Sequence, residues 1–76
     1  MASNDDLHKL NDFLSESGIE PGGCAVYQAN DGRYYMATLV VTSSGPLFLL
    51  NDRFFYDYAA RYRDTQPWKL LYTKPN

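Results

Sequence analysis

Cysteine and histidine each occur only once in this 76-residue sequence, as Cys24 and His8. A single cysteine cannot form an internal disulfide bond, and one cysteine with one histidine cannot build a Cys/His zinc site. No apolar run approaches the ~20 residues that span a bilayer, and no basic segment followed by an apolar stretch begins the chain. We therefore expect an intracellular, cytoplasmic protein without a secretory signal, a membrane segment, a metal or a cofactor.

The length sets a second limit. Seventy-six residues suffice for one hydrophobic core but not for two, so the sequence predicts a single domain over residues 1–76. Apolar residues make up 45% of the chain and charged residues 21%, which is the balance of an ordinary globular domain. Without a disulfide or a metal, packing alone or a partner must stabilise the fold.

Charge is distributed unevenly along the chain, although the net charge is only −2. Residues 1–31 carry six carboxylates and one lysine, whereas residues 32–76 carry six basic and three acidic side chains. Two interpretations fit this division. One is a solvated acidic helix beside a mixed-charge remainder, and the other is a dipolar molecule that its charges steer onto a charged partner.

Hydrophobic periodicity predicts an α+β fold of order α-β-β-β-α-β, with both helices packed on one face of an antiparallel sheet. The first helix is expected over residues 4–17, with Ser3 as N-cap, Asp6 completing a capping box, and Gly18 in the left-handed position after its end. Asn51 is expected to cap a second helix that runs to about Asp64. The strands are expected at residues 24–29, 33–41, 46–50 and 68–73.

The dipeptide Asp31-Gly32 predicts a two-residue type I′ turn between the first two strands. In that register we assign the more aliphatic face of the hairpin to the core. The residues of this face are Cys24, Val26, Gln28, Tyr35, Ala37, Leu39 and Val41. The other face is expected to be wet, with Ala25, Tyr27, Ala29, Tyr34, Met36, Thr38 and Val40. A slip of one residue would exchange the two faces. In the last strand we expect Trp68, Leu70 and Tyr72 to point inward.

Little in the sequence indicates catalysis. His8 is expected on the polar side of the first helix, next to acidic residues, where we expect no catalytic role for it. Cys24 begins a strand, where a free cysteine usually packs as a small hydrophobe, and no neighbour in sequence would activate it. The loop Pro21-Gly22-Gly23 leads into a strand, so it lacks the helix N-terminus of a phosphate site. We expect no enzymatic activity.

The predicted order α-β-β-β-α resembles that of double-stranded-RNA-binding domains. The resemblance is confined to element order. Asn51-Asp52-Arg53 stands where that family has a lysine-rich helix start, and Asn30-Asp31-Gly32 stands where the family has a Gly-Pro-x-His loop. We assign no family on this basis.

Twelve aromatic side chains are more than a core of this size needs, so several are expected at the surface. Tyrosine, methionine and arginine are enriched at protein interfaces. The alternative is a cross-strand pair of Tyr27 and Tyr34 that only stabilises the hairpin. The acidic first helix is a second possible interface. The partner-binding candidates are Tyr27, Tyr34, Met36, Tyr56, Arg63, Asp5, Asp12 and Glu16.

The predicted function is therefore stoichiometric, non-catalytic binding to a protein partner, which could itself be a nucleic-acid-binding complex. Small acidic antagonists encoded by phages and mobile elements, such as anti-CRISPR inhibitors, are proteins of this type, and the likeness is one of type alone. Two alternatives stay open: a Tyr/Arg sheet surface that stacks single-stranded nucleic acid, and a homodimeric accessory protein. An isoelectric point near 5.0 disfavours direct binding to nucleic acid.

Overall fold

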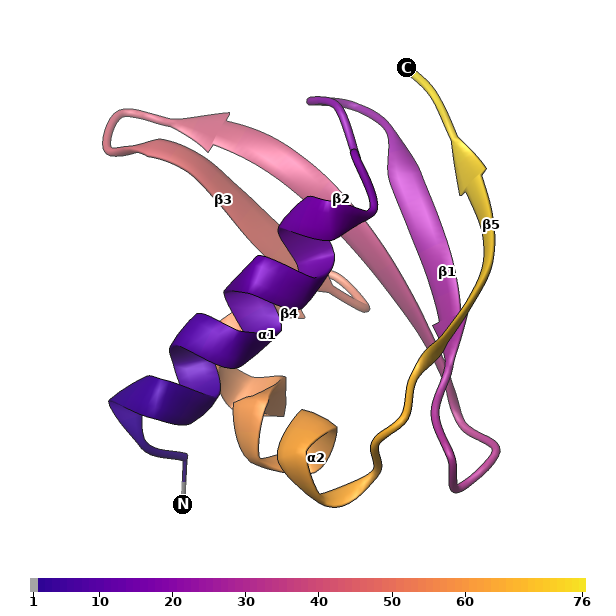
Figure 1. Cartoon of the computed structure of the whole chain (residues 1–76). Helices are drawn as coiled ribbons and strands as arrows, with labels where there is room; N and C mark the ends of the chain where they lie inside the picture. Colours follow the sequence, from indigo (N-terminus) through magenta and orange to yellow (C-terminus); the bar gives the residue numbers. More distant parts are fainter. Residues whose placement is uncertain (1) are drawn as a thin grey trace.

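The computed structural model describes residues 2–76 and confirms the α+β class. Five strands form one antiparallel sheet in the order β4-β3-β2-β1-β5, and α1 lies across one face of it (Figure 1). The 3-10 helix η1 and the short helix α2 pack on the same face, as predicted. The elements are α1 Asn4–Glu16, β1 Cys24–Gln28, β2 Tyr34–Thr42, β3 Gly45–Leu50, β4 Arg53–Phe54, η1 Phe55–Tyr58, α2 Ala59–Asp64 and β5 Lys69–Lys74.

Helix α1 begins where the sequence predicts and ends one residue earlier, at Glu16. The Ser3 hydroxyl accepts a hydrogen bond from the Asp6 N–H at 3.2 Å, and the Asp6 carboxylate accepts one from the Ser3 N–H at 3.0 Å. This capping box satisfies N–H groups that lack a partner within the helix. Gly18, at φ +71°, follows the last turn in the left-handed region. Leu10 and Leu14 are fully buried on the helix face that meets the core.

The β1–β2 register is one residue away from the predicted one. Tyr27 pairs with Tyr35, and the loop holds three residues instead of two. The loop is closed by the Ala29 N–H, which donates to the Arg33 carbonyl at 2.8 Å. Its third residue, Gly32, has φ +89°. A turn that ends on a left-handed glycine is the common three-residue hairpin loop, so Asp-Gly fits this geometry as well as the predicted type I′ turn.

The register difference turns β1 over and leaves most of β2 as predicted. The prediction that Tyr27 lies on the wet face is wrong, because its side chain is only 1% exposed. Val26 and Cys24, predicted to be core, lie on the opposite face and are partly exposed. Val41, also predicted to be core, is 67% exposed at the end of β2. The buried hairpin positions are Ala25, Tyr27, Ala29, Tyr35, Ala37 and Leu39.

Residues 51–54 form a second tight hairpin instead of a helix start. Asn51 and Asp52, at φ +50° and +65°, make a two-residue type I′ loop between β3 and β4. The Asn51 side-chain oxygen accepts from the Met36 N–H at 3.0 Å, and the Asn51 N–H donates to the Met36 carbonyl at 2.9 Å. Helical residues begin only at Phe55. The prediction that Asn51 caps a helix is therefore wrong.

An aromatic cluster around Trp68 joins both helices to the sheet. The Trp68 ring stacks on Tyr35 of β2, with 4.3 Å between ring centroids. Phe13 of α1 and Tyr62 of α2 meet the same indole edge-on, at 6.3 Å and 5.1 Å. The indole N–H donates to the Thr65 hydroxyl at 2.8 Å, so the polar atom of this buried ring is satisfied.

Strand β5 alternates less regularly than predicted. Trp68, just before it, is buried. Leu70 pairs with Tyr27 and so lies on the covered side, as predicted, although it is 43% exposed. Tyr72 pairs with Val26 on the opposite side and is 57% exposed, so the prediction that it points inward is wrong. The pairing of β5 with β1 shifts between Val26 and Tyr27, which is a bulge that breaks the alternation. Because β5 is also an edge strand, it has fewer neighbours to cover its side chains.

Candidate binding surface

The sheet face opposite α1 has no helix over it in the described part of the chain (Figure 1). Residues that lie directly opposite each other on antiparallel strands point to the same side, so the pairing defines which residues share this face. We call it the uncovered face. Its outward residues are Cys24, Val26, Gln28, Tyr34, Met36, Thr38, Val40, Leu47, Leu49, Phe54, Lys69, Tyr72 and Lys74.

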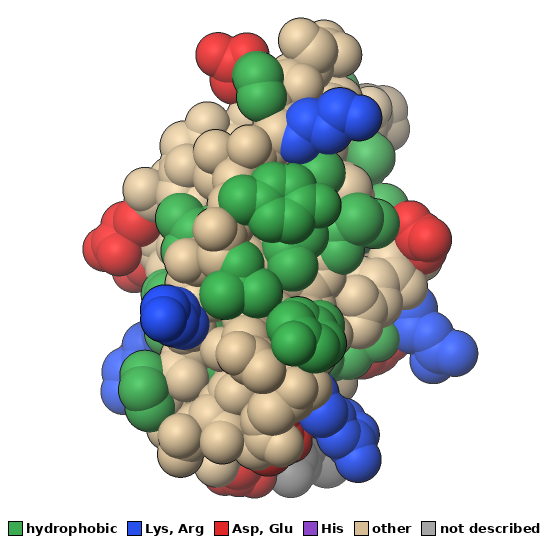
Figure 2. Space-filling model, turned by 90° about the vertical axis from the view of Figure 1, so that its right-hand side faces the viewer, with side chains coloured by type: hydrophobic (Ala, Val, Ile, Leu, Met, Phe, Trp, Pro, Cys, Tyr) green, Lys and Arg blue, Asp and Glu red, His purple; other side chains and the backbone are tan. Residues whose placement is uncertain are grey.

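Large apolar side chains are exposed on the uncovered face. Tyr34, Phe54 and Tyr72 are 62%, 54% and 57% exposed, and Met36 and Val40 are exposed by more than a third. Figure 2, which views the molecule from the side of β5, shows apolar side chains gathered at the centre with charged side chains around them. Contiguous apolar surface with a polar rim is typical of an interaction site.

A shallow hollow of about 530 Å³ lies at the β3–β4 end of the uncovered face. Apolar residues line much of it, with polar and charged residues at its margin. The lining residues are Val40, Thr42, Leu47, Leu49, Asp52, Arg53, Phe54 and Asp57. The hollow can receive a bulky apolar side chain, and its margin offers both signs of charge.

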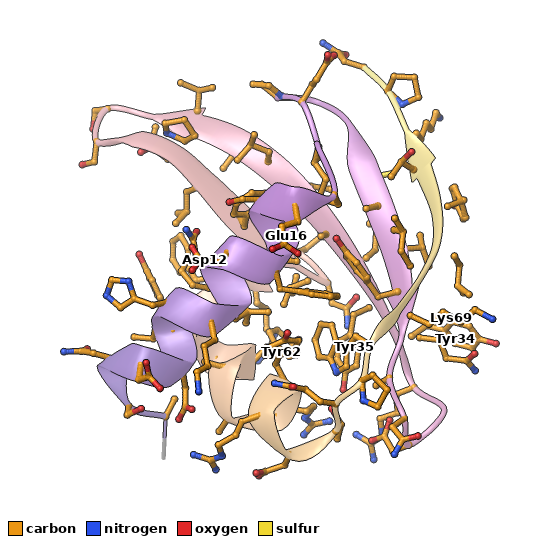
Figure 3. The ribbon with its side chains drawn as sticks, viewed as in Figure 1. Asp12, Glu16, Tyr34, Tyr35, Tyr62 and Lys69 are labelled. Atoms are coloured by element: carbon orange, nitrogen blue, oxygen red, sulfur yellow. The ribbon has the colours of Figure 1, made fainter. Side chains whose placement is uncertain are left out.

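A mixed aromatic and basic row crosses the other end of the face. Gln28 on β1 pairs with Tyr34 on β2 and with Lys69 on β5, so the three side chains share one row. Figure 3 shows Tyr34 and Lys69 at the same margin of the molecule. This row combines an exposed ring with an amine, and Arg33 precedes it in the hairpin loop.

The acidic candidates lie on a different surface. Asp5, Asp12 and Glu16 are all exposed on α1, and the Asp5 carboxylate pairs with the Lys9 amine at 3.1 Å. Figure 3 places Asp12 and Glu16 along α1, away from Tyr34. The acidic helix and the uncovered face are therefore two separate surfaces.

Arg63 is engaged within the molecule. Its Nη1 lies 2.9 Å from a carboxylate oxygen of Asp6, and its Nε lies 2.9 Å from one of Asp64. The pKa of Asp6 is held below its ordinary value, first by the hydrogen bond from the Ser3 backbone and then by the charge of Arg63. Arg63 thus joins α2 to the first turn of α1 and does not border the uncovered face.

The structure brings only part of the predicted partner-binding set together. Tyr34 and Met36 lie on the uncovered face, and Tyr56, half exposed in η1, has its ring 6.0 Å from that of Phe54 at the hollow. Tyr27 belongs to the core, where its hydroxyl is buried without a hydrogen-bond partner and burial raises its pKa.

Sequence reasoning missed three large contributors to the uncovered face. The sequence predicts Phe54 within the second helix and Tyr72 pointing inward, and it places Val40 on this face without selecting it as a binding residue. Asn51-Asp52 is the signal that could have found Phe54, because two consecutive residues that tolerate positive φ also fit a type I′ hairpin. The bulge that turns Tyr72 outward has no comparable signal.

The two residues considered for catalysis are not brought together. His8 is exposed on α1, where it borders a small hollow with Leu7, Asn11 and Phe55, and Cys24 is partly buried at the start of β1. Within residues 2–76, no group of three His, Cys, Asp or Glu side chains is placed to hold a metal ion. The uncovered face therefore offers a ligand exposed apolar contact area and charged side chains.

Comparison with protein families, curated proteins and solved structures finds no match to this chain. Among the described residues, neither helix is long and apolar enough to cross a membrane.

Proposed function

We propose that this protein is a non-catalytic protein-binding module that acts stoichiometrically through the uncovered face. The observation that carries the proposal is the exposure of Tyr34, Phe54 and Tyr72, each more than half accessible, on a sheet face over which residues 2–76 place no helix. Aromatic residues and methionine are enriched at protein interfaces because they offer large contact area. A partner that covers this face would remove the apolar surface from water, which is the main driving force of association.

The finer form of the proposal is an intracellular antagonist of a larger complex, of the kind that phages and mobile elements encode, including anti-CRISPR inhibitors. A compact sheet that offers one apolar face can block a partner's surface by occupying it. The exposed carboxylates of α1, on a separate surface, add a means of steering toward a basic groove, such as one that binds nucleic acid.

Affinity purification from the cells that produce the protein tests the proposal. Wild-type protein is expected to retain a partner, and Met36→Asp with Phe54→Asp is expected to lose it, because both changes place a charge in the contact area. Glu16→Lys on α1 is the matched control for a change of charge on the other surface. Far-UV circular dichroism and melting temperature confirm that each variant is folded. Equal recovery of the partner by the double variant, or a wild-type protein that retains none, contradicts the proposal.

A second candidate function rests on the row of Tyr34, Gln28 and Lys69. An exposed ring beside basic side chains on an open sheet is the arrangement that stacks single-stranded bases. If this function holds, a short single-stranded oligonucleotide binds tightly at low salt, and both Tyr34→Ala and Lys69→Ala weaken its binding. Weak binding that is insensitive to salt eliminates this candidate.

A further inference from the structure

The charges on the uncovered face differ between its two ends. At the β5 end, Lys69 and Lys74 point outward in the rows of Gln28 and Cys24. At the β4 end, Asp52 and Asp57 border the hollow together with Arg53. One end of the face therefore carries net positive charge, and the other carries net negative charge.

From this distribution we propose that the uncovered face binds a second copy of this chain, face to face, about a two-fold axis that runs parallel to the strands. This inference rests on the surface of the proposed function and names its occupant. Such an axis places the β5 end of each copy over the β4 end of the other, so lysines meet aspartates twice. A two-fold axis perpendicular to the strands would instead place lysines over lysines.

The apolar area of the face matches what such a dimer needs. A fully buried aromatic side chain removes roughly 150–250 Å² from water, so the exposed parts of the three rings, with Met36 and Val40, supply about 450 Å² per copy. A standard interface buries about 800 Å² per partner, of which somewhat more than half is apolar. Two twisted sheets pack well face to face at a spacing of about 10 Å.

The hollow gives the pairing a specific fit. Under the proposed axis, the β5 end of one copy lies over the hollow at the β4 end of the other. This axis keeps each residue at its position along the strands, so Lys74, which shares the row of Leu49 and Phe54, lies over the hollow. Tyr72, 57% exposed, lies in the next outward row of β5, and its ring would enter the apolar lining from there. Each dimer would contain this contact twice.

Association through the strand edges is less favourable. Antiparallel pairing of two β5 strands about their centre sets Lys69 opposite Lys74 of the other copy, and like charges that lie opposite each other destabilise a strand pair. The other edge, β4, contains only two residues. The face, rather than an edge, is therefore the self-complementary surface.

Sedimentation equilibrium and light scattering on the purified full chain test the proposal. Wild-type protein is expected to reach twice its mass of 8.7 kDa as its concentration rises over a range of about 5 to 500 µM. Val40→Asp is expected to raise the dimer Kd by at least about tenfold, because it buries an unpaired charge. Val41→Asp is the matched control, since Val41 is exposed on the opposite side of the same strand and should leave the Kd unchanged.

Charge reversal tests the axis. An acidic variant, Lys69→Glu with Lys74→Glu, and a basic variant, Asp52→Lys with Asp57→Lys, should each dimerise less well alone than the wild type. Mixed together, they should form a heterodimer, because opposite charges then meet at both contacts. The difference in dimerisation between each variant alone and the mixture should become smaller at high salt, because salt screens the charges.

Three outcomes overturn the proposal. One is a monomer at every concentration, the second is equal weakening by Val40→Asp and Val41→Asp, and the third is an acidic variant that dimerises as well as the wild type. A monomer that still captures a different protein through the same face would refute the dimer while leaving the proposed function intact. A dimer that captures no other protein would leave the inference standing and count against the antagonist.

Discussion

The two faces of the sheet use the same kinds of residue in opposite ways. On the covered face, Tyr27 and Tyr35 are 1% and 2% exposed, and their rings contact Phe13 and Trp68. On the uncovered face, Tyr34, adjacent in sequence to Tyr35, is 62% exposed. Successive residues of a strand point to opposite sides, so adjacent tyrosines enter different environments. The register of the strand, and not the type of residue, decides which ring stabilises the fold and which ring is free to bind.

The largest expected difference is in the free energy of unfolding, between alanine variants of Trp68 and of Tyr72. These two residues lie four positions apart in the sequence and on opposite faces of the sheet. Trp68→Ala should lower the free energy of unfolding by about 3–5 kcal/mol, because it removes the ring that joins both helices to the sheet. Tyr72→Ala should change it by less than about 1 kcal/mol. Urea unfolding followed by circular dichroism measures both values.

If Tyr72→Ala proved as destabilising as Trp68→Ala, the comparison between the faces would fail, because Tyr72 would then be a core residue. Tyr34→Ala, expected to cost as little as Tyr72→Ala, repeats the test on another strand.

The turn at Asn51 tests how Phe54 comes to lie on the uncovered face. Asn51→Ala should cost about 1–2 kcal/mol, since alanine at φ +50° is strained and the hydrogen bond to the Met36 N–H is lost. Asn51→Gly should cost less, because glycine adopts positive φ without strain. Thermal unfolding of the two variants gives the comparison, and a glycine variant less stable than the alanine variant would contradict the type I′ turn.

Removing the N-cap of α1 tests how much the capping box stabilises the helix that covers the sheet. Ser3→Ala should destabilise the domain by about 1 kcal/mol, because the Asp6 N–H loses its acceptor. Ser15→Ala, which removes an exposed hydroxyl in the same helix, should change stability by less than about 0.5 kcal/mol. Equal effects of the two changes, measured by urea unfolding, would mean that the capping box does not stabilise α1.

The smallest expected effect is a dependence on pH that comes from Asp6. Its pKa is lowered in the folded state, so its carboxylate stabilises the fold at pH values above the unfolded pKa. This contribution is lost as the pH falls through the lowered folded value. In urea unfolding between about pH 7 and pH 2, Asp6→Asn should be less stable than the wild type at neutral pH and should converge with it in acid. Asp5→Asn, which removes a carboxylate from the same helical turn but leaves the capping box and the Arg63 contact intact, is the matched control.

Local signals in the sequence were sufficient for much of the fold. The capping box at Ser3, the glycine at position 18 and the helical spacing of Leu10 and Leu14 fix α1 through neighbours in the chain. The α+β class followed in the same way. Such features depend on contacts within a few residues, which a single sequence displays directly.

The candidate surface was harder to predict than the fold. Each error in its prediction came from a turn with two possible geometries or from a contact between residues distant in the sequence. Asp31-Gly32 fits two- and three-residue loops equally well, and the choice between them reverses Tyr27. Asn51 serves as a helix cap or as a left-handed turn residue, and the choice moves Phe54 from a helix to a strand. Arg63 is a candidate because arginine is enriched at interfaces, but its ion pair with Asp6 joins residues 57 positions apart, and no local pattern in the sequence indicates that pair.

The positions of the two chain ends affect how any binding experiment should be arranged. Figure 1 shows them at opposite ends of the molecule, and the Asn76 side chain lies next to Gly22, close to β5. A purification tag or sensor surface attached after Asn76 would crowd the lysine-bearing end of the sheet. Attachment on the amino-terminal side of α1 keeps that end of the sheet accessible. The choice of which chain end is attached can therefore decide whether association is detected.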